Sequence, residues 1–282
     1  MDIDKVYNIF FSPTDSTKFV LQFLSEQISP KYTNINLTSR STKTDDFILN
    51  KSDLVFLGVP SYAGRVPTTF KERFSKINGN NALAVIVVTF GNRAQEDTLI
   101  ELFDLAKAQG FRILAGSAIV TEHSIIHDFG KGRPDKKDKS ELITFVQKIK
   151  NKLQDDVLLV DEIPGNRPYK EVKAVPMAPD FVKENCVACS RCASECPTGA
   201  IDDKTYKCNS EKCISCLRCV KVCPINCRFV DNKILEKLRV HLTPLCSERK
   251  NGSIINVGVR ENSLASTFIF LQKNKHKYIL FG

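Results

Sequence analysis

The chain has 282 residues, of which 42% are hydrophobic and 26% charged, and its formal net charge is +9 at pH 7. This length accommodates one or two domains with a large apolar core, so stability does not require disulfides. The basic residues are scattered among acidic ones, without an arginine-rich helix or an aromatic platform, which argues against nucleic-acid binding. Residues 1–11 lack a signal-peptide pattern and no apolar run reaches the ~20 residues of a membrane span, so we expect a soluble cytoplasmic protein.

The first half of the chain alternates short apolar runs with helix-like stretches. The strand candidates are residues 6–11, 54–59, 82–89 and 111–120, with a weaker one at 32–36. The helix candidates are residues 16–28, 68–77, 94–109 and 140–153. The last two main strand candidates are continuously apolar, which is typical of strands buried on both faces of a parallel sheet. Residues 1–153 are therefore predicted to form an α/β domain.

Three segments follow this domain. Residues 154–179 contain four prolines, which disfavour helix and central strand and predict an irregular linker. Residues 180–230 are predicted to form a small cysteine-rich domain. Residues 231–282 are an extension of unknown role, with candidate strands at 253–259, 267–271 and 278–281. This extension begins with apolar side chains at helical spacing, which predict an amphipathic helix that packs on one of the domains: Ile234, Leu238, Leu242 and Leu245.

All eleven cysteines lie between Cys186 and Cys246, and eight of them form two copies of the phrase C-x-x-C-x-x-C-x-x-x-C-P. A pair of zinc sites would usually combine two C-x-x-C hooks, without a third cysteine at the same spacing. A secreted disulfide scaffold would not leave the first 185 residues free of cysteine. We therefore interpret the cysteines as metal-binding thiolates in a reducing compartment.

Each copy resembles the phrase of bacterial-type two-cluster ferredoxins, in which three thiolates bind one 4Fe-4S cluster and the fourth binds the other. The resemblance implies one cluster on Cys186, Cys189, Cys192 and Cys223. It implies a second cluster on Cys213, Cys216, Cys219 and Cys196. Clusters of this type also indicate anaerobic conditions. Cys208, Cys227 and Cys246 are expected to be buried or free thiols, with Cys227 as an alternative ligand beside Cys223.

A run of hydroxyl residues follows the first strand candidate and leads into the first helix candidate. Hydroxyl groups, free backbone N–H groups and a helix N-terminus together suit a terminal phosphate. The same side chains could instead only cap the helix. The run comprises Ser12, Thr14, Asp15, Ser16 and Thr17.

Two later loops follow the next strand candidates, at the edge where open α/β sheets bind ligands. Each contains an aromatic ring able to stack near a planar cofactor and a glycine that allows close backbone approach. Either ring could equally be a packing residue. The first loop is Pro60, Ser61, Tyr62, Ala63 and Gly64, and the second is Thr89, Phe90, Gly91, Asn92 and Arg93.

These three loops stand in the order found in flavodoxins, which residues 1–153 resemble. The resemblance implies a doubly wound parallel sheet of order 2-1-3-4-5 with FMN bound by the three loops. The whole chain is similar to a bacterial-type family in which a flavodoxin-like domain is fused to a two-cluster ferredoxin, a small α+β domain. Asp15 departs from the glycine common in the phosphate loop and adds a negative charge beside the phosphate. Asn226 stands in a turn where the first cysteine copy has Gly199.

The leading hypothesis is an electron-transport flavoprotein that passes electrons between FMN and two 4Fe-4S clusters and exchanges them with redox proteins. The competing hypothesis is a flavin-dependent reductase of a small-molecule acceptor, fed by the clusters. A redox or iron sensor is a third possibility, but the chain has no recognisable output domain. No catalytic residue is predicted, because His123 and His127 lack a partner motif and are expected to have surface or hydrogen-bonding roles.

Overall fold

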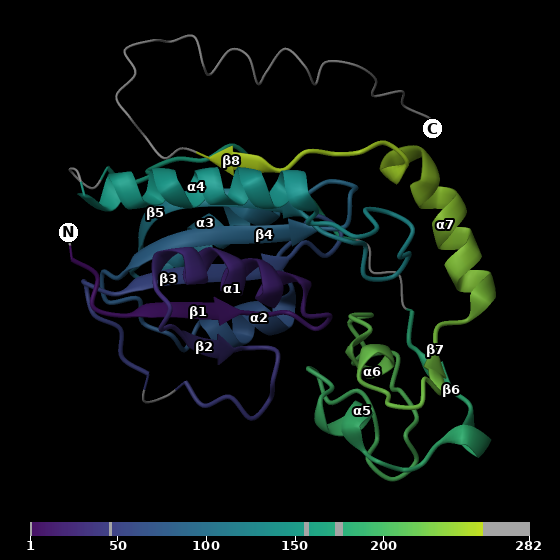
Figure 1. Cartoon of the computed structure of the whole chain (residues 1–282). Coiled ribbons are helices and arrows are strands. Elements are labelled where there is room, and N and C mark those ends of the chain that lie inside the picture. The colour runs from purple at the N-terminus through teal and green to yellow at the C-terminus, as the bar shows by residue number, and fades with distance from the viewer. Residues whose placement is uncertain (1, 45–46, 155–157, 173–176, 256–282) are drawn as a thin grey trace.

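The computed structural model describes residues 2–44, 47–154, 158–172 and 177–255. Its centre is a six-stranded sheet of order β2-β1-β3-β4-β5-β8 (Figure 1). The strands are β1 (Val6–Phe10), β2 (Thr33–Asn36), β3 (Leu54–Pro60), β4 (Leu83–Phe90), β5 (Arg112–Val120) and β8 (Ser253–Ile255). The first five are parallel, which confirms the predicted flavodoxin-like order, and β8 adds an antiparallel edge strand beside β5.

Two helices cover each face of this sheet. Helices α1 (Ser16–Ile28) and α4 (Lys136–Gln154) cover one face, and α2 (Thr68–Phe74) and α3 (Thr98–Ala108) cover the other. Side chains alternate along β1, so Phe10 packs under α1 while Ile9 packs on the opposite face. Both faces of β4 are fully buried, which explains its continuously apolar sequence.

The helix boundaries differ from the predicted ones where local backbone chemistry intervenes. Helix α3 begins at Thr98, four residues later than predicted, because Glu96 just before it has a left-handed backbone with φ of 45°. Helix α4 begins four residues earlier than predicted, at Lys136. There the Asp135 carboxylate accepts hydrogen bonds from the backbone N–H groups of Lys137 (2.9 Å) and Asp138 (3.1 Å).

The cysteine-rich region contains two short helices, α5 (Arg191–Ser194) and α6 (Arg218–Lys221), a 3-10 turn η1 (Lys183–Asn185), and an antiparallel pair, β6 (Asp180–Phe181) with β7 (Arg228–Phe229). The two cysteine copies fold alike. Ser190 and Leu217 precede α5 and α6 with φ of 58° and 57°, and Gly199 and Asn226 have φ of 65° and 53°. Asn226 thus adopts the left-handed turn expected in place of glycine.

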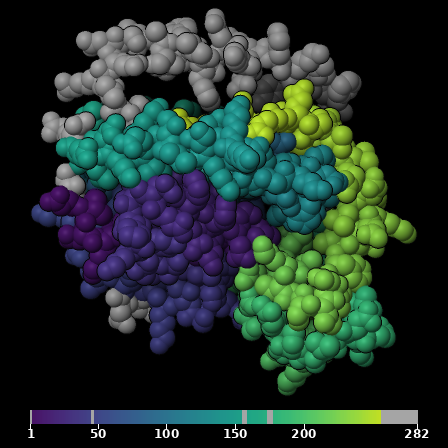
Figure 2. Space-filling model, in the orientation of Figure 1, coloured from purple at the N-terminus to yellow at the C-terminus, as the bar shows by residue number. Residues whose placement is uncertain are grey.

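Helix α7 (Asn232–Cys246) joins the cysteine-rich region to the sheet (Figures 1 and 2). The helix was predicted, and two of its four predicted face residues, Leu238 and Leu242, are packed against the molecule. Leu235 and Cys246 complete the packed stripe in place of Ile234 and Leu245. Ile234 and Leu245 are instead 37% and 43% exposed. The stripe contacts both parts of the chain, through Ile126 and Phe129 after β5 and through Leu217 and Val230 of the cysteine-rich region.

The segment between the two parts follows the surface of the sheet domain. Val160 and Ile163 insert into its core, and Asn166 donates two hydrogen bonds to Asp97 at the start of α3. Among the described residues, no helix is long and apolar enough to cross a membrane. The candidate strands at 267–271 and 278–281 lie outside the described residues.

Candidate cofactor sites

A hollow of about 350 Å³ opens at the carboxyl ends of the parallel strands. It brings the three predicted loops together, and the segment after β5 also reaches it. Its lining is Ser12, Pro13, Thr14, Ser16, Thr17, Pro60, Ser61, Tyr62, Thr89, Phe90, Gly91, Thr121, Glu122 and Ser124. Five predicted residues lie in these loops without lining the hollow, namely Asp15, Ala63, Gly64, Asn92 and Arg93. Thr121, Glu122 and Ser124 were missed, although their position after a strand end was the available signal.

Hydrogen bonds hold the first loop open at this hollow. Ser12 N donates to Thr38 Oγ1 at 2.6 Å, and Ser12 Oγ accepts from Lys18 N at 3.0 Å. The Thr17 and Thr89 hydroxyls, 2.7 Å apart, connect the first loop to the third. The first turn of α1 has no acidic residue, and its N-terminal residue Asp15 makes no side-chain cap. The hydroxyls and the helix N-terminus therefore fit a phosphate group.

Two residues of the predicted third loop have other partners. Asn92, with φ of 58°, donates from Nδ2 to the carbonyls of Cys246 (2.7 Å) and Glu248 (2.9 Å). Its Oδ1 accepts from Lys250 N at 3.0 Å. The Arg93 guanidinium forms an ion pair with Glu96. Asn92 thus ties the loop after β4 to the end of α7.

The two aromatic rings of the loops stand at the hollow in different environments. Phe90 is 7% exposed, whereas Tyr62 is half-buried, with its ring centroid 6.5 Å from that of Phe11. Burial, reinforced by the nearby Cys216 thiol, raises the pKa of Tyr62 well above its usual value. Ile214, between Cys213 and Cys216, packs against the same apolar core as Tyr62. Helix α6 of the second cysteine copy contacts the first loop, where Arg218 Nη1 donates to the Pro13 carbonyl at 3.0 Å, so this copy lies beside the rim of the hollow.

His123 lies behind the third loop. A Cβ on Gly91 would stand 2.6 Å from the His123 ring, so only glycine fits there. His123 Nδ1 accepts from the backbone N–H groups of Ile125 (3.2 Å) and Ile126 (3.0 Å). Burial lowers the pKa of His123 to about 4. The ring is therefore neutral at pH 7 and holds a turn, in line with the expected hydrogen-bonding role.

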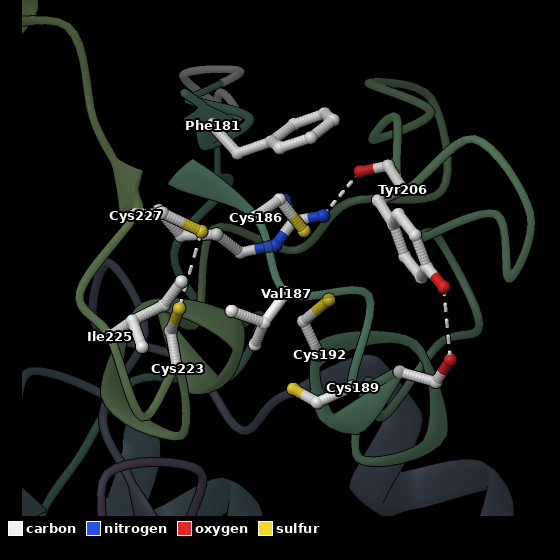
Figure 3. A pocket seen from close by; sticks show the side chains of 11 residues that line it. Phe181, Cys186, Val187, Cys189, Cys192, Tyr206, Cys223, Ile225 and Cys227 are labelled. Carbon is white, nitrogen blue, oxygen red and sulfur yellow. Dashed lines mark hydrogen bonds between the residues drawn. The ribbon is translucent and has the colours of Figure 1, made fainter. Parts of the chain in front are cut away.

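A second hollow, of about 330 Å³, lies within the cysteine-rich region. Figure 3 shows the sulfur atoms of Cys186, Cys189, Cys192 and Cys223 around the space beside Val187. Cys227 also lines it, with its sulfur 3.5 Å from that of Cys223. Burial, together with the neighbouring Cys223 sulfur, raises the pKa of Cys227 to about 12.

Five other cysteines lie near one another: Cys196, Cys208, Cys213, Cys216 and Cys219. Cys196 and Cys219 are buried together around Ala200, with Cys208 and Cys213 packed against them. Burial raises the pKa of both Cys216 and Cys219 to about 12, and the thiols of Cys196 and Cys213 contribute. Among the described residues, no three His, Cys, Asp or Glu side chains converge on a position for a single metal ion.

Arg228 is a buried cation between the two sets of cysteines, and only 3% of it is exposed. Its Nη2 donates to the Tyr206 carbonyl, and its guanidinium lies 5.2 Å from the Phe181 ring centroid. Burial alone would lower the pKa of Arg228, but a hydrogen bond with Cys192 and the nearby Cys219 thiol raise it. Its Nη1 has no hydrogen-bond partner within the described part of the chain.

Residues 179–224 match the family model of the 4Fe-4S dicluster domain. Solved structures similar to the sheet domain include an archaeal flavodoxin (13% identity, TM-score 0.40, covering 54% of this chain and 100% of that one). A second is flavodoxin 1 from Bacillus cereus, with 14% identity and a TM-score of 0.39, covering 52% of this chain and 98% of that one. A third is rubredoxin oxygen:oxidoreductase from Desulfovibrio gigas, with 17% identity and a TM-score of 0.39, covering 54% of this chain and 37% of that one. No curated protein matches the sequence. The chain combines a flavodoxin-like sheet domain, assigned by its strand order, with a 4Fe-4S dicluster domain.

Proposed function

We propose that the protein is an electron-transfer iron-sulfur flavoprotein that passes electrons between FMN and two 4Fe-4S clusters. The observation that carries the proposal is the contact of helix α6, in the second cysteine copy, with the first loop of the hollow. Arg218 Nη1 donates to the Pro13 carbonyl at 3.0 Å and Lys221 Nζ donates to the Thr14 carbonyl at 2.7 Å, which brings one set of thiols to the sheet-domain hollow. When bound, the clusters supply one-electron chemistry and the flavin supplies one- or two-electron chemistry. The protein's own task is to hold these groups close together.

The hydroxyl-lined part of the hollow is the proposed phosphate site. Ser12, Thr14, Ser16 and Thr17 would bind the FMN phosphate with the N-terminus of α1, and Tyr62 and Phe90 would flank the flavin ring. Pro60, Ser61, Thr89 and Gly91 also line the hollow and would border the flavin. The five other predicted positions, Asp15, Ala63, Gly64, Asn92 and Arg93, would shape the loops. Their side chains do not line the hollow.

The crossed ligand assignment is the proposed one for the clusters. Cys223 lines the same hollow as Cys186, Cys189 and Cys192, which supports one ligand set. The thiol of Cys196 acts electrostatically on both Cys216 and Cys219, which supports the other set with Cys213. Helix α6, which contains Cys219 of this second set, contacts the first loop of the hollow. The proposed path would therefore run from the flavin site through this set to the set that contains Cys189, whose side chain is exposed.

Four units follow from this assignment. Residues 1–153 would be the FMN-binding unit, 154–179 the linker, 180–230 the cluster unit and 231–282 an extension, of which α7 and β8 attach the cluster unit to the sheet. Donors and acceptors would be redox proteins that reach the exposed Cys189 side. We propose an anaerobic cytoplasm as the setting, because the thiols would have to remain reduced there.

Cofactor content after anaerobic purification is the first test. About eight irons and one FMN per chain are expected from the ligand count. A preparation that contains both clusters but binds no flavin, even after titration with FMN, would refute the flavin half of the proposal. Saturable and stereoselective turnover of a small acceptor would identify a reductase instead of a carrier.

The second test follows electron transfer inside the chain. The oxidised protein is mixed rapidly with a one-electron reductant while cluster and flavin absorbance are recorded. In Cys216→Ser the flavin should be reduced more slowly than in the wild-type protein. Cys246→Ser is the matched control, because Cys246 is also buried but belongs to neither set of cysteines. Equal flavin reduction rates in all three proteins would contradict the proposed path.

A further inference from the structure

Helix α6, at the centre of the second cysteine copy, makes direct contact with the phosphate loop of the sheet domain. Arg218 Nη1 donates to the Pro13 carbonyl at 3.0 Å and to Asp15 Oδ2 at 3.1 Å. Lys221 Nζ donates to the Thr14 carbonyl at 2.7 Å and lies 3.5 Å from Asp15 Oδ2. Two cationic side chains of the cluster unit therefore bind two consecutive backbone carbonyls and one carboxylate of the loop.

The position of Arg218 is fixed within the cysteine-rich region. Its Nε and Nη2 both donate to Glu195 Oε2, at 3.0 and 2.5 Å, and its side chain is only 19% exposed. Arg218 is also the residue directly before Cys219, a proposed cluster ligand. Binding of a cluster on this set would therefore fix the same backbone that presents Arg218 and Lys221 to the loop.

These contacts change the expected effect of Asp15. A lone carboxylate in the loop would repel a phosphate. Here Asp15 is paired with two cations and its side chain does not line the hollow. Together with Glu195, which Arg218 also binds, these four groups have a charge of about zero beside the phosphate loop, so the repulsion by Asp15 is offset. The backbone of Asp15 has φ of 65°, a left-handed conformation that glycine adopts readily. Asp15 thus has the backbone geometry of a glycine at this position, and its carboxylate binds Arg218 and Lys221.

The contacts also orient the loop backbone. In a trans peptide the N–H group points opposite to the preceding carbonyl. Because Arg218 holds the Pro13 carbonyl on the α6 side, the Thr14 N–H group points to the opposite side of the loop. An N–H group fixed in this way is available to an anion without a prior rearrangement, which lowers the cost of binding.

We propose that Arg218 and Lys221 are positioning residues for the FMN phosphate, which they act on through Pro13, Thr14 and Asp15. This inference rests on the proposed function. Binding of FMN and ordering of the second cluster's helix are thereby coupled, and the coupling is reciprocal. The cluster unit thus forms part of the flavin site, and the flavin stabilises the docked position of the cluster nearest to it.

The test is a double variant, Arg218→Gln with Lys221→Gln, in the full-length protein loaded with both clusters. Its dissociation constant for FMN, measured by quenching of flavin fluorescence, should rise about tenfold, the effect expected from losing charge-assisted hydrogen bonds. The affinity for riboflavin, which lacks the phosphate, should change much less. Iron content and circular dichroism, unchanged from the wild-type protein, confirm that the variant is folded and loaded.

Arg191→Gln is the matched control. Arg191 is the first residue of α5, as Arg218 is the first residue of α6, and it also forms an ion pair with Glu195, at 3.4 Å. Within the described part of the chain, Arg191 makes no hydrogen bond or ion pair with the phosphate loop, so FMN affinity should stay at the wild-type value. An FMN dissociation constant within twofold of wild type in the double variant would overturn the inference, as would equal weakening of FMN and riboflavin. Failure of the wild-type protein to bind FMN would instead refute the proposed function itself.

Discussion

Replacement of Arg228 by methionine tests whether the buried cation sets the reduction potentials of the clusters. Methionine keeps much of the apolar volume of the side chain and removes the charge. Arg228 is 3% exposed, contacts Cys192 of one set and lies near Cys219 of the other. Reduction adds one negative charge to a cluster, and a buried cation favours that charge. Loss of Arg228 should therefore make both clusters harder to reduce, and more so the one bound by Cys192.

The size of the effect follows from Coulomb's law. A unit charge roughly 4–8 Å from the guanidinium, at an effective dielectric of about 20, interacts with it by about 2–4 kcal/mol. Part of this is lost to screening, so we expect a fall in potential of at least about 59 mV, a tenfold change in the one-electron equilibrium constant. Arg228→Lys keeps the positive charge without the planar guanidinium group, and it should lower the two cluster potentials less than Arg228→Met does.

Redox titration followed by electron paramagnetic resonance measures the two cluster potentials. The flavin potential, measured by absorbance in the same samples, is the internal control and should not move by a comparable amount. Iron analysis must show both clusters in every variant. If Arg228→Met contains both clusters and its cluster potentials equal those of the wild-type protein, the electrostatic reasoning is wrong.

Three other predictions concern single side chains. Cys223→Ser should lose one cluster, measured as a fall from about eight irons per chain to about four. Cys227→Ser should keep both clusters. Two full clusters in Cys223→Ser would show that Cys227 replaces Cys223 as a ligand. The pKa of His123 is about 4 in the folded state, below its unfolded value, so the folded protein binds fewer protons. The free energy of unfolding should therefore fall by about 2 kcal/mol as the pH decreases from about 6.5 to 5. Denaturant titrations of His123→Gln should show a weaker dependence of this free energy on pH. Glu101 accepts hydrogen bonds from Arg65, Lys71 and the Val66 N–H group, and these outweigh the effect of burial and lower its pKa. Its contribution to the stability of the fold is therefore present above about pH 4.5 and is lost in more acid solution. Glu101→Gln should destabilise the fold by about 3 kcal/mol at pH 7 in chemical unfolding, and an unchanged midpoint would contradict this.

The sheet domain was largely predictable because its signals are local. Helix α1 has the predicted bounds of 16–28, and the apolar run of β4 reflects burial on both faces. The three loops were predictable as a group, since the carboxyl ends of parallel strands meet at one edge. The left-handed backbone of Glu96, which delays α3, has no such signal, because nothing in a single sequence distinguishes it from a first helical turn.

Contacts between distant segments were not predictable in the same way. The pairing of Asp15 with Arg218 joins residues far apart in sequence, and each looks like an ordinary surface charge until the chain is folded. Arg228 follows Cys227 in a segment that has no pattern indicating a buried cation. Helix α7 was predicted, but its packed face depends on two partners, and the periodicity of its own apolar residues fits two adjacent stripes about equally well.

Three independent attachments hold the cluster unit against the sheet domain. Arg40 and Arg73 of the sheet domain donate to the carbonyls of Ala193 and Pro197, on the first cysteine copy. Helix α6 grips the phosphate loop, and α7 leads to β8, which pairs with β5 at the far edge of the sheet. Domains joined by a single flexible linker are expected to move relative to each other. A unit attached at three places is held in one position on the sheet domain, so the electron transfer that we propose between the two sites would require no prior domain movement.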